Sequence, residues 1–200
     1  MTMKKRNRKI EPEKTIAYDP SAPLPDDLVK LMNEYRSLSD KAQRTKHIYA
    51  CVGLALYWAQ CFEVEMQLSL IFRRKAEGEL SSGKEHDDFN QQLSDMTQGK
   101  LIRHFEEFVE LDDCGRDLLK AALRARNSLA HGFFERHSED FLHASGQERM
   151  LDELLEWIRL FQLAEGLSQV VTNAQIPLFG KTREEMEAEA QKYLESKLDL

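Results

Sequence analysis

The sequence has few of the residues that break helices. Its 200 residues include five Pro and nine Gly, too few for a protein built from many tight turns between strands. No stretch shows the regular alternation of apolar and polar residues that is typical of a half-buried strand. The sequence therefore predicts an all-α protein, and its length makes one domain with one sizeable core the default.

Cysteines and long apolar runs are also scarce. The three cysteines, Cys51, Cys61 and Cys114, are an odd number without paired spacing. We therefore expect reduced core residues of an intracellular protein. No run approaches the roughly 18 uninterrupted apolar residues of a membrane span, and residues 1–14 lack the apolar segment of a signal peptide. The prediction is a cytoplasmic protein that has no membrane segment.

The motifs of the common cofactor and metal enzymes are missing. The sequence contains no glycine-rich phosphate loop, Cys-x-x-Cys, His-Glu-x-x-His or Gly-x-Ser-x-Gly. His137 and His143 lie six positions apart, which is about 120° around a helix. No Cys or carboxylate completes a ligand set with these two histidines. We expect neither a cofactor nor a metal.

The net charge of −7 is unevenly distributed. Residues 1–14 carry six Lys or Arg against two Glu, whereas the other residues carry 22 basic and 33 acidic side chains, a net charge of −11. The body of the protein therefore repels polyanions on average, and any contact with nucleic acid has to be local. Residues 1–25 also contain four prolines, so this segment is predicted to be a flexible basic arm, either simply solvated or touching nucleic acid.

Apolar spacing predicts a helical bundle domain over residues 26–176. The expected helices lie at about 26–38, 40–75, 88–96, 98–110, 115–132 and 145–173. Between positions 48 and 72 the second of these is apolar on all sides, as expected of a buried helix. Residues 77–88 form a polar connection, and residues 133–145 are expected to be a broken helix.

Capping residues support several of these boundaries. Thr97 and the pair Asp112-Asp113 are expected N-caps of the two helices that follow them. Ser145-x-x-Glu148 and Thr182-x-x-Glu185 both have the form of a capping box. The second of these opens a final helix within residues 177–200. Its narrow apolar stripe, for packing on the bundle or on a partner subunit, consists of Met186, Ala190, Tyr193 and Leu194.

The helix expected at 115–132 has one basic face. On a wheel of about 100° per residue, a stripe roughly 80° wide carries Arg116, Lys120, Arg124, Asn127 and His131. The opposite side is apolar, yet Arg126 falls on it, and a guanidinium is rarely buried without a partner. Glu63 is likewise the charged residue on the most apolar face of the long helix. It is either an exposed carboxylate at the edge of the packing or a hydrogen-bonded partner of Arg126.

Arg126-Asn127-x-x-x-His131, followed by Gly132, resembles the signature of HEPN domains, which is an Arg, a polar residue and, four to six positions on, a His. The segment from Gly53 to Phe72 is also similar to the central helix of some families in this group. The resemblance implies an antiparallel bundle with two long central helices and additional C-terminal helices, often dimeric. It also implies metal-independent cleavage of RNA and, in toxin or defence systems, a protein partner such as an antitoxin.

The residue types suit this chemistry. RNA carries its own nucleophile, so His131, with an unperturbed imidazole pKa of about 6.5, can move protons while Arg126 binds phosphate oxygens and Asn127 orients the scissile group. Arg116, Lys120 and Arg124 are the expected RNA-binding residues, and Glu63 is the expected support for Arg126. Because Arg126 and His131 lie about 140° apart around a helix, both reach one phosphate only if the helix ends near His131, if the arginine wraps round, or if a second subunit contributes.

Each of these residues also has an ordinary structural explanation. Arg126 can be an ion-pair residue, Asn127 a solvent-facing polar residue and His131 a helix-terminal histidine. Two other functions therefore stay open. One is a non-catalytic interaction or adaptor module of the same fold, and the other is a binder of small molecules or nucleotides in a pocket between the long helices.

Overall fold

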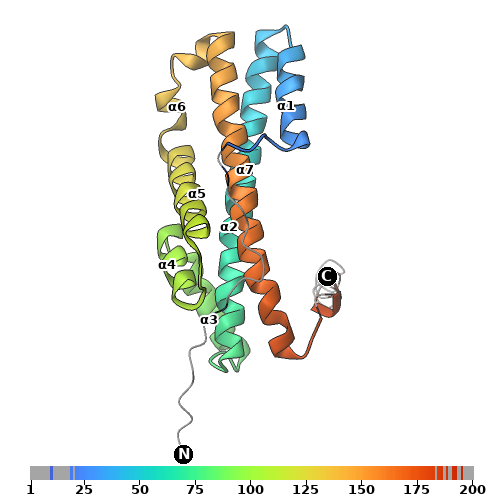
Figure 1. Cartoon of the computed structure of the whole chain (residues 1–200), viewed down its shortest axis with the longest axis vertical. Coiled ribbons are helices and arrows are strands. Elements are labelled where there is room, and N and C mark those ends of the chain that lie inside the picture. Colours follow the sequence, from blue (N-terminus) through green and yellow to red (C-terminus); the bar gives the residue numbers. More distant parts are fainter. Residues whose placement is uncertain are drawn as a thin grey trace, which may run out of the picture. The chain divides into compact units, whose positions relative to one another are not determined.

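A computed structural model describes residues 21–182, together with Ile10, Asp19 and the residues 184–186, 188, 191, 192 and 195. The described residues form helices and connections, with one isolated bridge and no sheet, so the all-α prediction is confirmed. The helices are α1 (Asp26–Ser37), α2 (Lys41–Ala76), α3 (Gly83–Ser94), α4 (Gln98–Phe108), α5 (Asp113–His131), α6 (Phe133–Arg136), η1 (Asp140–Leu142), α7 (Ala144–Gln175) and η2 (Ile176–Phe179). Figure 1 labels the α-helices.

The described residues divide into two compact units. The first unit contains residues 21–64 and 111–167 with Asp19, and the second contains residues 65–110 and the described residues from 168 onward, with Ile10. The long helices α2 and α7 each contribute their first part to the first unit and their last part to the second.

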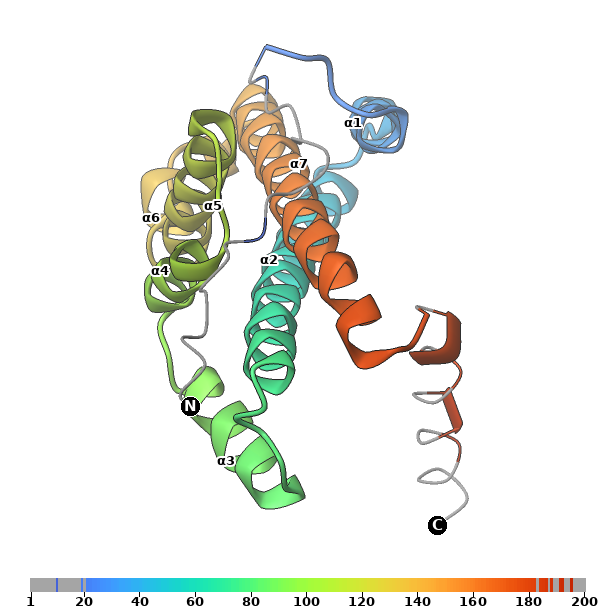
Figure 2. The ribbon, with the colours of Figure 1, turned by 60° about the horizontal axis from the view of Figure 1, so that its bottom comes forward.

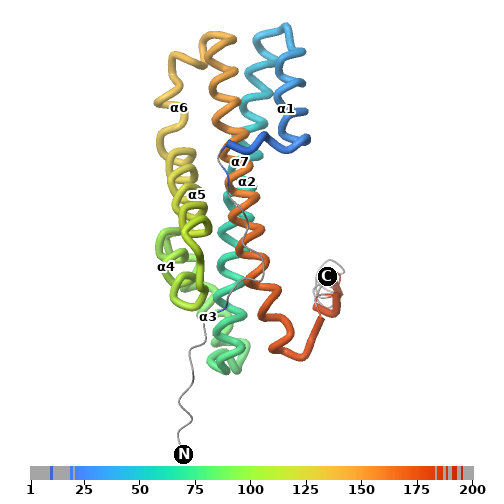
Figure 3. The backbone as a smooth tube through the Cα atoms, viewed as in Figure 1, coloured from blue at the N-terminus to red at the C-terminus, as the bar shows by residue number. Residues whose placement is uncertain are grey.

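In the first unit, α1 and α5 lie on opposite sides of α2 and α7 (Figures 1 and 2). The Tyr35 hydroxyl of α1 donates to the carbonyl of Ala144 at 3.0 Å, and Gln147 near the start of α7 donates to Thr45 near the start of α2 at 3.3 Å. These first parts of α2 and α7 therefore run in the same direction, as the tube in Figure 3 shows. By contrast, α5 runs antiparallel to α2, because Arg126 of α5 lies opposite Glu63 and Ala130 lies beside Leu56.

The core of the first unit is made of large apolar side chains from four helices. Fully buried members are Leu28 of α1, Ile48 and Phe62 of α2, Leu118 and Leu119 of α5, and Met150, Leu154, Ile158 and Phe161 of α7. Burying one such side chain contributes roughly 1.5–3 kcal/mol. In this unit α7 buries residues around most of its circumference, whereas the buried residues of α2 share one face and several of its large apolar side chains are exposed. The prediction that α2 is buried on most sides is therefore wrong here.

The second unit has a small polar network between α2 and α7. The Ser69 and Thr172 hydroxyls lie 2.6 Å apart, and the Ser69 hydroxyl donates to the carbonyl of Ser168 at 3.2 Å. The guanidinium groups of Arg73 and Arg74 lie over the rings of Phe108 and Phe89. These contacts connect α3 and α4 to the last turns of α2.

Two parts of the predicted N-terminal arm make contacts. Ile10 forms an isolated parallel bridge with Val109, in which the Ile10 amide donates to Phe108 at 2.8 Å and the Glu110 amide donates to Ile10 at 2.9 Å. In the first unit, Arg159 donates to the carbonyl of Ala22 at 2.7 Å. The arm is therefore paired at these points, and the other residues before Asp19 lie outside the described part.

Two predicted helix starts need correction. The α3 helix begins at Gly83 rather than near 88, because Ser82 and Glu85 form a capping box. Hydrogen bonds from Ser81, and then from Ser82, lower the pKa of Glu85 to about 2. The α7 helix begins at Ala144, so Ser145 lies inside it rather than at its cap. The α4 helix begins at Gln98 with Thr97 at its N-cap, as predicted, although the Thr97 side chain makes no hydrogen bond to the helix.

Other boundary predictions are confirmed. Residues 133–145 form a broken helix, with α6 and η1 separated by a turn. The Thr182 hydroxyl accepts from the Glu185 amide at 3.2 Å, and the Glu185 carboxylate accepts from the Thr182 amide at 2.7 Å, as a capping box requires. Ala190, Tyr193 and Leu194 lie outside the described residues, so the packing of that final helix stays a prediction.

The cysteines are free thiols. Cys51 is buried, and burial raises the pKa of its thiol to about 11. Cys61 and Cys114 are only half-buried, so the prediction of core cysteines is confirmed for Cys51 alone. None of the helices in the described ranges combines the length and apolarity needed to cross a membrane.

Gly146 allows η1 to pass against the first turn of α7. A Cβ atom added at Gly146 would lie 2.2 Å from the carbonyl oxygen of Asp140 and 2.5 Å from its Cα. Both are backbone atoms, so a side chain at this position requires η1 to move. Gly53 is the opposite case, because a Cβ atom added there meets nothing within 4 Å.

Substituting these two glycines should therefore have opposite effects on stability. We expect Gly146→Ala to lower the free energy of unfolding by about 1–3 kcal/mol through overpacking. Gly53→Ala should raise it by up to about 1 kcal/mol, because alanine is the better helix former. Urea unfolding of both variants measures the difference. A Gly146→Ala variant as stable as the parent would contradict the close approach of η1 and α7.

Candidate functional site

The candidate motif lies on the last turns of α5. The helix begins with Asp112, whose carboxylate accepts from the Gly115 amide at 2.7 Å, and it ends at Gly132, whose amide donates to Ser128 at 3.0 Å. One face of α5 is buried, and it consists of Gly115, Leu118, Leu119, Ala122, Ala125 and Leu129. This face fixes the rotation of the helix, and the motif side chains occupy what remains of its circumference.

The predicted basic stripe faces solvent, but its members differ in their contacts. Arg116 donates to the carbonyl of Leu111 and pairs with Asp113 at 2.7 Å. Lys120 pairs with Asp117 at 3.8 Å. Both expected RNA-binding residues are therefore engaged in local ion pairs. Arg124 is exposed and has no side-chain partner among the described residues.

Asn127 and His131 are exposed at i, i+4 on the same face of α5. The Arg126 guanidinium donates to the side-chain oxygen of Asn127 at 3.5 Å. His131 makes no side-chain hydrogen bond to any described residue. The structure therefore brings Arg126 into contact with Asn127 and leaves the imidazole of His131 open to solvent.

The pairing of Arg126 with Glu63 is confirmed, but its predicted form is wrong. The Arg126 Nη2 and Glu63 Oε2 atoms lie 3.9 Å apart, which is an ion pair and too long for a hydrogen bond. The side chains are 36% and 26% exposed, so neither charge is fully desolvated. Water reaches both groups, and the carboxylate holds the guanidinium in place without occupying its N–H donors.

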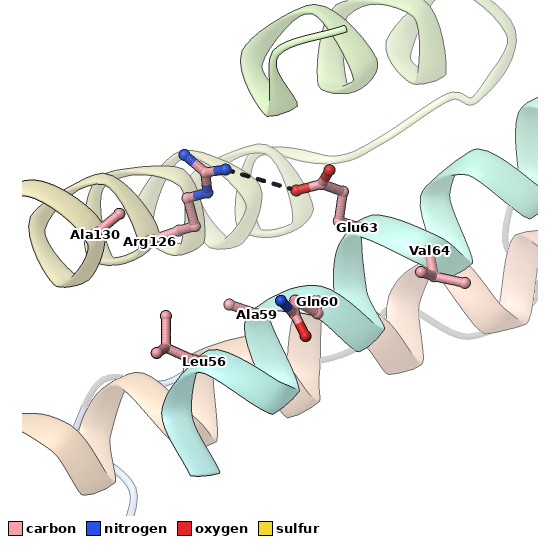
Figure 4. Close-up of a pocket in the computed structure, with 7 residues that line it drawn as sticks. All are labelled: Leu56, Ala59, Gln60, Glu63, Val64, Arg126 and Ala130. Carbon is pink, nitrogen blue, oxygen red and sulfur yellow. Dashed lines mark ion pairs between the residues drawn. The ribbon is translucent and has the colours of Figure 1, made fainter. Parts of the chain in front are cut away.

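A cavity of about 370 Å³ opens beside this ion pair. Its lining comes from Leu56, Ala59, Gln60, Glu63 and Val64 of α2 and from Arg126 and Ala130 of α5. Figure 4 shows the Arg126 side chain extending from α5 toward Glu63 across the gap between the two helices. Arg126 thus lies on the side of α5 that faces α2, whereas the exposed stripe lies on another side.

A second group of polar residues, which sequence reasoning missed, surrounds His137. Its Nδ1 atom lies 2.8 Å from Asp140 and its Nε2 atom 2.5 Å from Glu153. Arg136 pairs with Glu153 at 3.1 Å, and Arg149 pairs with Asp140. Hydrogen bonds, first from His137 and then from Arg149, hold the pKa of Asp140 below its usual value. The i, i+3 spacing of His137 and Asp140 could have predicted their contact from the sequence. Glu153 lies on another helix, so no spacing along the chain indicated its contact with His137.

The described part of the chain contains no group of three or more His, Cys, Asp or Glu residues arranged to hold a metal ion. Around His137, both ring nitrogens already face carboxylates, and two arginines pair with those carboxylates. The cluster is therefore a network of ion pairs and hydrogen bonds.

The partial exposure of the Glu63–Arg126 pair sets a small expected effect on stability. Glu63→Ala should lower the free energy of unfolding by no more than about 1 kcal/mol, as for other exposed ion pairs. Phe62→Ala, at the adjacent and fully buried position, should cost about 3–5 kcal/mol. Chemical denaturation compares the two. A loss at Glu63 as large as that at Phe62 would mean that the pair is far more desolvated than its exposure indicates.

The arrangement combines three functional groups near the end of α5. It offers an arginine held in place with free donors, an amide in contact with it, and an imidazole open to solvent. Such a set can bind an oxyanion and transfer a proton. No family model, curated protein or solved structure matches the chain.

Proposed function

We propose that the protein is a metal-independent endoribonuclease that uses Arg126, Asn127 and His131. The observation that carries the proposal is the state of Arg126, which Glu63 positions at 3.9 Å while most of its N–H donors stay free. A guanidinium in this state can bind two phosphate oxygens. The exposed Asn127 and His131 lie on the same turns of α5 and supply the other groups that the reaction needs.

The reaction is a transphosphorylation within the RNA. The ribose 2′-oxygen attacks the adjacent phosphorus, the bond from phosphorus to the 5′-oxygen breaks, and the products are a 2′,3′-cyclic phosphate and a 5′-hydroxyl end. One group accepts the proton of the 2′-hydroxyl and another gives a proton to the leaving 5′-oxygen. A single chain offers one motif histidine for these two steps, whereas two chains offer two.

The exposed side of α2 supports a homodimer. Between its buried positions this helix exposes Tyr49, Leu56, Tyr57 and Val64, with Gly53 and Gln60 among them. We call these six residues the α2 stripe. The exposed Phe134 continues it, with its ring centroid 5.8 Å from that of Tyr49. A contiguous exposed apolar surface of this kind is typical of an interaction site.

A second copy of this chain fits the α2 stripe because the surface is self-complementary. A two-fold interface brings the same surface of both copies together. Glu63 and Arg126 lie beside the stripe and carry one charge of each sign, so the arginine of each copy can face the carboxylate of the other. The same arrangement adds the His131 of a second α5 and joins two cationic surfaces on a protein of net charge −7.

The rival function is a non-catalytic interaction module. The α2 stripe is the observation that favours it, because an apolar surface binds a different protein as readily as a second copy. The two functions differ in what His131 does. An adaptor that binds through α2 does not depend on an imidazole at the end of α5.

The nuclease should therefore depend on His131 and not on a metal. We expect the purified protein to cleave a single-stranded RNA into products with 2′,3′-cyclic phosphate ends, in the presence of EDTA as well as without it. His131→Ala should lower the rate about 10²–10⁴-fold. His104→Ala is the matched control, because His104 is a 45% exposed histidine on α4 outside the motif. Cleavage that survives His131→Ala, or that EDTA abolishes, would count against the proposal.

The homodimer should depend on the α2 stripe. We expect the parent protein to be a dimer by light scattering at micromolar concentration, and Leu56→Glu to be a folded monomer because it places a charge in the apolar interface. Val29→Glu is the control, since Val29 on α1 is 40% exposed and Leu56 is 41% exposed. A monomeric parent, or an equal effect of both substitutions, would show that the stripe is not a dimer interface.

A further inference from the structure

A groove of about 310 Å³ separates α5 from α7 on the side of α5 away from Glu63. Its lining includes Ala121, Arg124 and Ser128 of α5 and Glu153, Trp157 and Leu160 of α7. Trp157 and Leu160 are buried and form an apolar floor. The polar groups at the rim are a guanidinium, a hydroxyl and one carboxylate, which makes the groove different from the α2 stripe.

Arg124 is a cation of this groove for which the described part of the chain supplies no partner. Arg116 and Lys120, about two turns and one turn earlier on α5, pair with Asp113 and Asp117 respectively. The side chains of Arg124 and Ser128 make no hydrogen bond or ion pair to the described residues. At i, i+4 on one face of α5, they present a positive charge and a hydroxyl donor to the same space.

Glu153, the one acidic residue in the groove lining, already has two partners outside the groove lining. His137 Nε2 lies 2.5 Å from its carboxylate and Arg136 lies 3.1 Å from it. The other ring nitrogen of His137 faces Asp140, which pairs in turn with Arg149. The carboxylate of Glu153 is therefore held by cationic and donor groups, and Arg124 keeps its positive charge available.

The groove is continuous with the motif along α5. Arg124, Ser128 and His131 lie at i, i+4 and i+7, so they share one side of the helix. Arg124 and His131 are separated by roughly 10 Å along the helix axis, given a rise of about 1.5 Å per residue. An RNA strand with one phosphate bound at His131 therefore has a second cationic position, Arg124, about two turns away along α5.

We propose that the groove between α5 and α7 is a subsite for a backbone phosphate that flanks the scissile one. Arg124 and Ser128 bind this phosphate, and His137 and Arg136 are positioning residues that keep Glu153 away from Arg124. This proposal rests on the proposed RNA cleavage. It places the next part of the RNA strand along α5, between the motif and the groove. It requires an RNA longer than the two nucleotides that flank the cut.

The test measures binding separately from cleavage. A fluorescein-labelled single-stranded RNA is titrated with the His131→Ala protein at several salt concentrations, and binding is followed by fluorescence anisotropy. Adding Arg124→Ala should weaken binding about tenfold, as for the loss of a charge-assisted hydrogen bond. It should also reduce the slope of log affinity against log salt by about 0.7, the value for one phosphate contact of a single strand. Arg103→Ala on α4 removes an exposed arginine that makes one backbone bond, and it should change neither quantity beyond a small nonspecific effect.

A double-mutant cycle tests the positioning role. His137→Ala should weaken RNA binding, although His137 does not touch the RNA, because Glu153 is then free to pair with Arg124. In a Glu153→Gln background the same substitution should have no effect. The subsite is wrong if Arg124→Ala changes RNA binding no more than Arg103→Ala does. It is also wrong if His137→Ala still weakens binding in the Glu153→Gln background. Neither result contradicts the proposed RNA cleavage. If the His131→Ala protein binds no RNA at all, both the subsite and the proposed nuclease are overturned.

Discussion

The burial of one face of α5 determines where the candidate side chains of the first unit point. Leu118, Ala122, Ala125 and Leu129 repeat at helical spacing and are buried, and this burial stabilises one rotation of the helix about its axis. Because successive residues are about 100° apart around the helix, this rotation also fixes the directions of the other side chains. Arg126 must turn toward α2, Ser128 toward α7, and Asn127 and His131 toward solvent.

The small alanine side chains on this face let α5 pack closely against its neighbours. Ala122 and Ala125 are small, and both are buried, so α5 can lie close to its neighbours at these positions. Close packing leaves the longer side chains at the edges of the contact, where Arg126 reaches Glu63 on one side and Arg124 borders the groove on the other. The candidate side chains therefore lie at two edges of one helix.

Local charge balance decides which cations of α5 are available. The body of the protein is acidic, and Arg116 and Lys120 pair with aspartates three residues away on the same helix. Such exposed pairs contribute little to stability, but they reduce the positive potential at the start of α5. Toward its end, Arg124 has no partner within the described ranges, and Arg126 is only loosely paired. The positive potential of the motif helix is therefore concentrated on the turns that also carry Asn127 and His131.

The sequence by itself determined the helices and the solvent exposure of the motif. The apolar period of α5, the Asp112 cap and Gly132 at the end are local features, and local features set the bounds of a helix. Where the boundaries differed, at α3 and α7, the sequence contained competing cap signals, and the Ser82-Glu85 box and the packing of η1 on Gly146 decided between them. Tertiary structure alone decided the length and exposure of the Glu63–Arg126 pair, and it alone assembled the groove with Glu153 and His137. Those features join residues of different helices, and their distances depend on how closely the helices pack, which the spacing of residues along one chain does not specify.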